Sequence, residues 1–147
     1  MWIKSRHLLG GVLAASAMGA AFALDYLGPV PRPDPIEVKF TRGVTLAPDE
    51  ERRLSAFVAQ YITEPKLLFH VTGYTSNRGD VDANLTLSQE RADQVAGILS
   101  RNGIEDTRIL AAEGLGPANP PEIEPGESDT AHRRRMARAL VQVVVQK

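Results

Sequence analysis

The spacing of apolar residues from position 36 onward changes repeatedly between a period of two and a period near 3.6. A period of two is typical of a strand with one buried face, and a period of 3.6 is typical of an amphipathic helix. Alternation or short apolar runs predict four strands. These strands cover Ile36–Phe40, Leu67–Tyr74, Arg108–Ala112 and Ala139–Val145.

Helical spacing lies between these strands. The first helix is expected to begin near Pro48 and to end before Pro65, because proline favours the first turn and breaks a helix interior. The second is expected after the loop Thr75–Ala83, with a capping box at Thr86 and Gln89. A short, basic third helix is expected at Ala131–Arg138, after a proline-rich surface loop at Gly114–Ser128. The buried stripes of the first two helices are expected to be Leu54, Phe57, Val58 and Tyr61, then Ala92, Val95, Ile98 and Leu99.

The resulting order is β-α-β-α-β-(α)-β over residues 36–147. This alternation predicts a two-layer α+β domain, in which helices pack on a mixed four-stranded sheet.

The first 27 residues have the pattern of an export signal and are not expected to join this domain. Lys4 and Arg6 precede an uncharged segment, Leu8–Leu24, and small residues flank Phe22 at Ala21 and Ala23. The segment is either a signal peptide cleaved near Ala23 or an uncleaved inner-membrane anchor formed by residues 8–24. Both alternatives export the rest of the chain. Residues 28–35 carry four prolines and are expected to form an extended linker.

Composition excludes several function classes. A net charge of −1 in 147 residues gives no global field that would attract nucleic acid. The absence of cysteine excludes disulfides, thiolate metal sites, a cysteine nucleophile and a lipid-modified N-terminal cysteine. There is no clustered set of metal ligands and no histidine near a plausible catalytic serine–acid pair in sequence. We therefore expect a protein that is not an enzyme, with no metal and no cofactor.

The most distinctive stretch is the strand–loop–helix segment Gly73–Leu99. It holds the pattern N-x-x-L-S-x-x-R-A-x-x-V-x-x-x-L, after Gly-Tyr-Thr and before Gly-x-Gly and two arginines. The positions are Gly73, Tyr74, Thr75, Asn84, Leu87, Ser88, Arg91, Ala92, Val95, Leu99, Gly114, Gly116, Arg134 and Arg138. In these residues the chain resembles the C-terminal domain of OmpA-like proteins, the peptidoglycan-binding module shared by OmpA, Pal and MotB. The resemblance implies the fold predicted above.

The resemblance also implies a binding site. The family pocket holds the diaminopimelate residue of a peptidoglycan stem peptide between an aspartate and an arginine. Arg91 occupies the arginine position, where its planar guanidinium suits a carboxylate. Ser76 occupies the aspartate position, so the expected partner for the ligand's amine carries no charge here. Further departures from the family pattern are Pro117, Ala137 and Ala139.

Other residues are candidates for the same site, each with a structural alternative. Asp80 and Asp82 lie in the same loop and either supply the missing carboxylate or set the turn geometry. Asn84 either touches the ligand or caps the loop. Arg91 itself has an alternative as a surface residue paired with Glu90 or Asp93.

The basic run His132–Arg135 either binds an anionic partner or is a solvated helix face. Arg134 and Arg138 are the two residues of this region that we assign to the pocket, because they fit the family's arginines before the last strand.

Two functions follow from the resemblance. The first is a non-catalytic protein of the Gram-negative periplasm, soluble or anchored, that binds peptidoglycan; association with the outer membrane is compatible with this. The second is a structural accessory subunit of an inner-membrane complex, which uses an altered OmpA-like domain for protein contacts. The departures at Ser76 and Ala137 favour the second function, and Arg91 and the export signal suit both.

Overall fold

The computed structural model describes residues 33–146. The predicted export segment at residues 1–27 and most of the predicted linker at 28–35 lie outside this range. The described elements, in chain order, are β1 (Ile36–Arg42), β2 (Thr45–Leu46), α2 (Glu50–Ala59), β3 (Leu67–Gly73), α3 (Val81–Arg101), the 3-10 turn η1 (Asp106–Arg108), β4 (Ile109–Gly114), α4 (Asp129–Met136) and β5 (Arg138–Val145).

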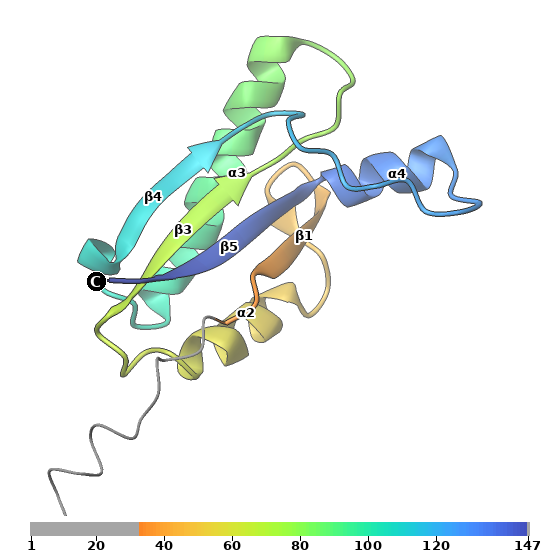
Figure 1. Ribbon diagram of the computed structural model, residues 1–147. Helices are drawn as coiled ribbons and strands as arrows, with labels where there is room; N and C mark the ends of the chain where they lie inside the picture. Colours follow the sequence, from red (N-terminus) through yellow and green to blue (C-terminus); the bar gives the residue numbers. More distant parts are fainter. Residues whose placement is uncertain (1–32, 147) are drawn as a thin grey trace, which may run out of the picture. The chain divides into compact units, whose positions relative to one another are not determined.

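The strands form one mixed sheet in the order β2-β1-β5-β3-β4. Strand β3 lies between β5 and β4, and it pairs antiparallel with β5 and parallel with β4 (Figure 1). The predicted α+β class and the four predicted strands are confirmed, and β2 adds a fifth strand at the edge. Sequence periodicity missed β2 because a two-residue strand has no measurable alternation. Gly43 turns the chain at φ 54°, and β1 continues into this hairpin instead of ending at Phe40.

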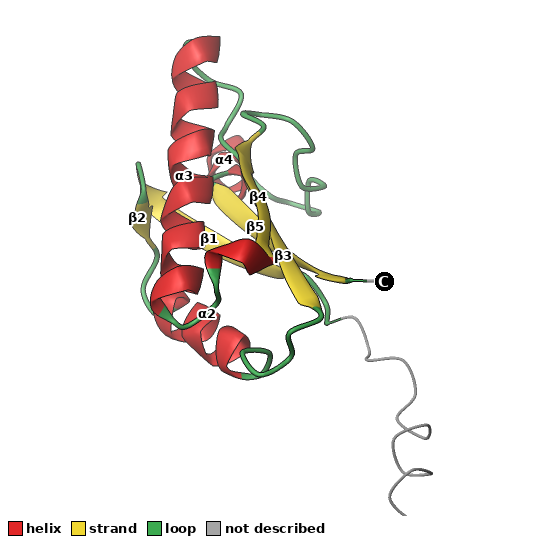
Figure 2. Cartoon of the chain, turned by 90° about the vertical axis from the view of Figure 1, so that its left-hand side faces the viewer, coloured by secondary structure: helices red, strands yellow, loops and turns green. Residues whose placement is uncertain are grey.

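Helices α2 and α3 lie on the same side of the sheet (Figure 2). The core fills the space between the sheet and these two helices, because alternate residues of each strand point toward the helices. Removing each such aliphatic side chain from water contributes roughly 1.5–3 kcal/mol. The fully buried members with the largest side chains include Phe69, Leu54, Leu67, Ile98, Leu99, Val38, Val58, Val71, Val95 and Val141.

Helix α3 lies unusually close to the sheet at its first half. A Cβ placed on Gly73 would come within 1.9 Å of the Ser88 carbonyl oxygen, and one on Gly114 within 2.2 Å of the Gln89 nitrogen. Both strands therefore need glycine at this point. The hydroxyl of Ser88 accepts a hydrogen bond from the Gly116 nitrogen at 2.9 Å, which joins the helix to the chain beyond β4. This contact fixes where α3 begins relative to the strand ends.

The start of α3 differs from the prediction. The helix begins at Val81, and the Asp80 carboxylate accepts a hydrogen bond from the Ala83 nitrogen at 2.8 Å. The predicted capping box is wrong, because Thr86 lies inside the helix. Gln89 instead bonds the Ala112 carbonyl and the Gly114 nitrogen. Aspartate is among the strongest N-cap residues, so the earlier cap prevails.

Candidate functional site

The candidate site lies where three strands meet the start of α3. The Tyr74 nitrogen donates to the Arg138 carbonyl at 2.8 Å, and the Thr75 nitrogen donates to the Gly116 carbonyl at 2.8 Å. The end of β3 is thereby joined to the start of β5 and to the segment after β4. The loop from Tyr74 to Asp80 then leads into α3. The predicted strand–loop–helix junction is therefore held by main-chain hydrogen bonds on both sides.

Arg91 is buried beneath this junction, with 4% of its surface exposed. Its Nε donates to the Gly43 carbonyl at 2.8 Å, and its Nη1 donates to the Tyr74 carbonyl at 2.8 Å. The guanidinium carbon lies 5.1 Å from the centre of the Phe40 ring, within cation–π range. The alternative of a surface arginine paired with Glu90 or Asp93 is wrong, because Arg91 spans from the β1–β2 hairpin to the end of β3.

No carboxylate of the described residues lies within ion-pair distance of Arg91. Its Nη2 also has no hydrogen-bond partner among them. Desolvation lowers the pKa of Arg91, but a guanidinium remains protonated at any working pH. A buried charge normally has a partner of opposite sign. The arrangement therefore leaves a cation with one free donor nitrogen, which can receive an anionic group.

Two hydroxyl side chains follow the carbonyl that Arg91 holds. Thr75 is 2% exposed, and its Oγ1 has no hydrogen-bond partner within the described part of the chain. A buried polar atom without a partner is uncommon and calls for an explanation. Ser76 is half-buried at the next position. The two residues that follow the carbonyl bonded to Arg91 therefore carry neutral hydroxyl groups.

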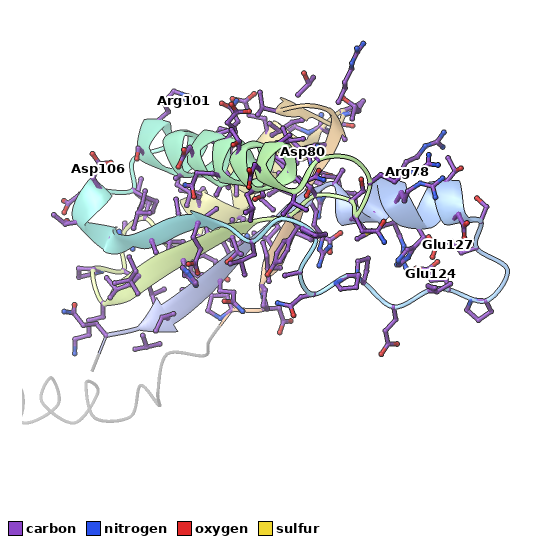
Figure 3. The ribbon with its side chains drawn as sticks, turned by 90° about the horizontal axis from the view of Figure 1, so that it is seen from above. Arg78, Asp80, Arg101, Asp106, Glu124 and Glu127 are labelled. Carbon is purple, nitrogen blue, oxygen red and sulfur yellow. The ribbon has the colours of Figure 1, made fainter. Side chains whose placement is uncertain are left out.

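The predicted acidic candidates are not brought to Arg91. Asp80 serves as the N-cap of α3, and Asp82 lies exposed in the first helical turn, where a carboxylate stabilises the helix dipole. Asp80 and Asp82 are about 16 Å and about 13 Å from Arg91 along the helix axis. Asn84 donates from Nδ2 to the Arg78 carbonyl at 2.8 Å, which caps the loop. Figure 3 shows Arg78 and Asp80 together at the loop that enters α3.

Arg138 approaches Tyr74 from β5. Its guanidinium lies 4.5 Å from the centre of the Tyr74 ring, and its Nη2 donates to the Asn119 carbonyl at 2.7 Å. Its Nε lies 3.6 Å from the Glu37 carboxylate, and its buried Nη1 has no partner among the described residues. Tyr74 is thus contacted by two of the three predicted arginines, by Arg91 at the carbonyl and by Arg138 at the ring.

Arg134 is exposed on α4, and no carboxylate of residues 33–146 lies within 4.0 Å of it. The structure gives it no contact with Arg91 or with Arg138.

The basic run on α4 has two kinds of residue. Arg134 is exposed, whereas His132 and Arg135 belong to an ion cluster with Glu124 and Glu127. Arg135 contacts Glu127 at 2.8 Å and Glu124 at 2.6 Å, and His132 Nδ1 lies 3.4 Å from Glu127. Burial alone would raise the pKa of Glu127, but hydrogen bonds from the Glu124 nitrogen and from Arg135 bring it below its ordinary value. The cluster ties the proline-rich segment to α4, as the positions of Glu124 and Glu127 in Figure 3 show.

Sequence reasoning missed Thr75 as a member of the site. The sequence marks Thr75 only as the end of a strand. Its burial depends on contacts with the segment after β4, such as the hydrogen bond from its main-chain nitrogen to the Gly116 carbonyl. A threonine directly after a buried strand and beside a glycine-rich segment is the one signal that could have marked it. Within residues 33–146 no group of three acidic or histidine side chains forms a metal cluster.

The comparison with known families decides the assignment. The family model described as the OmpA family matches residues 40–135, more than half of the chain. The chain belongs to the OmpA family. The matched range runs from the end of β1 through α4 and includes Arg91, Thr75 and Ser76.

The relatives support the same assignment. The chain is 41% identical over 93 residues to probable lipoprotein YiaD of Escherichia coli, with 63% of this chain and 42% of that protein covered. It is 35% identical over 85 residues to outer membrane porin F of Pseudomonas fluorescens, covering 58% of this chain and 25% of that protein. The match therefore spans less than half the length of either relative.

A solved structure has the same fold. The crystal structure of the peptidoglycan-associated lipoprotein from Burkholderia pseudomallei superposes with a TM-score of 0.63 at 24% identity. The superposition covers 74% of this chain and 89% of that structure. At this identity the likeness shows the fold alone. Among the described residues, no helix has the length and apolar character needed to cross a membrane.

Proposed function

We propose that this chain is a non-catalytic protein of the Gram-negative cell envelope that binds peptidoglycan through its OmpA-family domain. The names of its relatives support the location, because they include a lipoprotein and an outer membrane porin. The name of the structural neighbour, a peptidoglycan-associated lipoprotein, supports the ligand class. Arg91 is proposed to hold a carboxylate of the stem peptide, in particular that of diaminopimelate.

The observation that carries this proposal is the state of Arg91. The side chain is buried, its Nε and Nη1 are fixed by two carbonyl oxygens, and its Nη2 is left without a protein partner among the described residues. A guanidinium held in this way is preorganised, so a carboxylate can bind it without further ordering of the side chain. Ser76 and Thr75 add hydroxyl donors to the same junction.

Co-sedimentation with purified peptidoglycan sacculi tests the proposal. The full chain, kept in a neutral detergent, is expected in the pellet, and Arg91→Ala is expected in the supernatant. Arg101→Ala is the matched control, because Arg101 is an exposed arginine in the last turn of the same helix. Recovery of the wild-type chain in the supernatant would overturn the proposal.

Because Arg91 is buried, a loss of binding in Arg91→Ala needs a second readout that does not depend on a variant. Soluble stem peptide added to the wild-type chain is expected to release it from the sacculi. Binding that persists at saturating peptide would show that the domain attaches by another group.

The second candidate is an accessory subunit that uses the same domain for protein contact. It is favoured by the neutral Ser76, which stands where a zwitterionic ligand would need a carboxylate for its ammonium group. A pull-down in mild detergent is expected to recover a stable membrane complex under this alternative. Removal of residues 1–27 is then expected to abolish the complex.

A further inference from the structure

We infer that the Arg91 site selects a carboxylate whose neighbouring nitrogen is acylated, in preference to the zwitterionic end of a free amino acid. This inference rests on the proposed function and names the chemical form of the ligand that the site accepts. Ser76 is the residue proposed to set the preference.

Arg91 is a buried cation, and its two protein hydrogen bonds go to the neutral carbonyl oxygens of Gly43 and Tyr74. The side chains that follow the Tyr74 carbonyl are the hydroxyl groups of Thr75 and Ser76, which are also neutral. No charged side chain of the described residues is paired with Arg91. A single anionic group neutralises its charge.

The acidic residues nearest to Arg91 in the sequence form no ion pair with it. Glu90 and Asp93 are exposed neighbours on α3 at one and two positions from Arg91, so they point to other sides of the helix. Asp93 accepts a hydrogen bond from Gln89. Asp80 is committed to the cap of α3, and Asp82 lies exposed in its first turn.

Three further acids belong to other groups of side chains. Glu50 binds Arg53 and the Lys39 nitrogen, Glu113 binds His70, and Glu37 lies near Arg138. No carboxylate of the described residues forms an ion pair with Arg91.

The unpartnered Thr75 Oγ1 can donate to a carboxylate oxygen or accept from an amide N–H. Ser76 has the same two capacities. Neither can compensate the charge of an ammonium, which beside an unpaired guanidinium is repelled strongly in a partly buried setting. An amide nitrogen carries no charge, so it is not repelled by Arg91 and needs only a hydrogen-bond acceptor, such as a hydroxyl oxygen.

The two forms of ligand both occur in peptidoglycan chemistry. The free end of diaminopimelate carries a carboxylate and an ammonium on one carbon. When that nitrogen is acylated in a cross-link, the carboxylate charge remains and the ammonium charge is lost. A peptide chain terminus also presents a carboxylate next to an amide nitrogen. The shared chemistry is an N-acylated amino-acid carboxylate.

Equilibrium titration of the full chain with three soluble probes tests the inference. The probes are free diaminopimelate, diaminopimelate acetylated on both nitrogens, and acetyl-D-alanyl-D-alanine. The diacetyl probe is expected to bind at least about tenfold more tightly than free diaminopimelate, because it carries no ammonium near Arg91. Tighter binding of the dipeptide than of the diacetyl probe would assign the ligand to a chain terminus, and the reverse to a cross-link.

Two variants at one position separate charge from size. Ser76→Asp is expected to reverse the preference, so that free diaminopimelate binds more tightly than its diacetyl form. Asparagine has nearly the same volume as aspartate but no charge, so Ser76→Asn is expected to keep the wild-type order of affinities. Because Ser76 lies half-buried in a loop, both variants are expected to melt near the wild-type temperature.

The outcomes distinguish this inference from the proposed function. Equal or tighter binding of free diaminopimelate to the wild-type chain would overturn the inference, as would an unchanged order in Ser76→Asp. Binding of sacculi without binding of any probe would also overturn it while leaving peptidoglycan binding intact. Failure to bind sacculi would overturn the proposed function itself.

Discussion

The Nη1 of Arg91 donates a hydrogen bond of 2.8 Å to the main-chain carbonyl of Tyr74. This bond joins the third turn of α3 to the residue just beyond β3, across 17 positions of sequence. It also fixes the guanidinium, because Nε is held at the same time by Gly43. A cation that is both buried and immobilised loses little further freedom when an anion binds, which favours affinity.

Asp80 is expected to act in stability and not in ligand binding. Asp80→Ala removes the N-cap bond to the Ala83 nitrogen and is expected to lower the free energy of unfolding by about 1 kcal/mol. Asp80→Asn keeps a capping oxygen and is expected to stay close to wild type. Urea unfolding measures both. If Asp80→Asn binds sacculi less well than the wild type, a role for this carboxylate at the ligand is indicated.

Gly73 is expected to be essential for the packing of α3. Gly73→Ala forces a Cβ against the Ser88 carbonyl, so we expect a loss of roughly 3 kcal/mol or more, or failure to fold. Gly97→Ala, on α3 itself, is the control, because a Cβ at this position meets only the flexible end of Arg101 at 3.3 Å. That variant is expected to gain up to about 1 kcal/mol from helix propensity. Comparable stability of the two variants in thermal melts would contradict the close approach.

The ion cluster on α4 is expected to make stability sensitive to acid. The pKa of Glu127 is lowered in the folded state, so its carboxylate contributes stability that is present above its unfolded pKa of about 4.3. That contribution is lost as the pH falls through the folded-state pKa. Hydrogen bonds and charge from Arg135 are among the causes of the lowering.

Arg135→Gln is therefore expected to melt at a lower temperature than the wild type at neutral pH, with a smaller difference at about pH 3, below the unfolded pKa of Glu127. Arg133→Gln is the matched control, because Arg133 bonds only the Thr130 hydroxyl among the described groups. Melting curves over this pH range measure the difference. A constant gap between Arg135→Gln and the wild type at all pH values would contradict the role assigned to Glu127.

The order of elements was predictable because burial on one face imposes a period on the sequence. Leu67 and Phe69 alternate as a strand requires, and Val95 and Leu99 repeat as a helix requires. The strand β2 was not predictable in this way. The N-cap of α3 was also misplaced, because Thr86 has the spacing of a capping box and the true cap is Asp80.

The burial of arginines could not be read from the sequence. Arg91 is satisfied by carbonyl oxygens at Gly43 and Tyr74, and main-chain acceptors leave no mark on residue type. Arg108 behaves in the same way, since it bonds four carbonyl oxygens near the start of β3. Those acceptors belong to Tyr61, Ile62, Glu64 and Leu67. The tertiary structure decides these roles, because the partners lie 41 to 47 positions from Arg108.

The positions of the candidate site residues were predicted in part. The family pattern placed Arg91 and Ser76 at one junction, and the structure puts both there. It does not bring Asp80, Asp82 or Arg134 to Arg91. Thr75 was added by the structure, because an unpartnered hydroxyl is visible only when every neighbouring donor and acceptor is placed.

The central claim is that the guanidinium of Arg91 holds a carboxylate ligand. The most direct test is the dissociation constant of a soluble stem peptide for the wild-type chain and for Arg91→Lys, which keeps the charge and removes the planar fork. We predict saturable binding to the wild type and binding at least about tenfold weaker to Arg91→Lys. Equal affinity of the two proteins, with equal melting temperatures, would contradict the account.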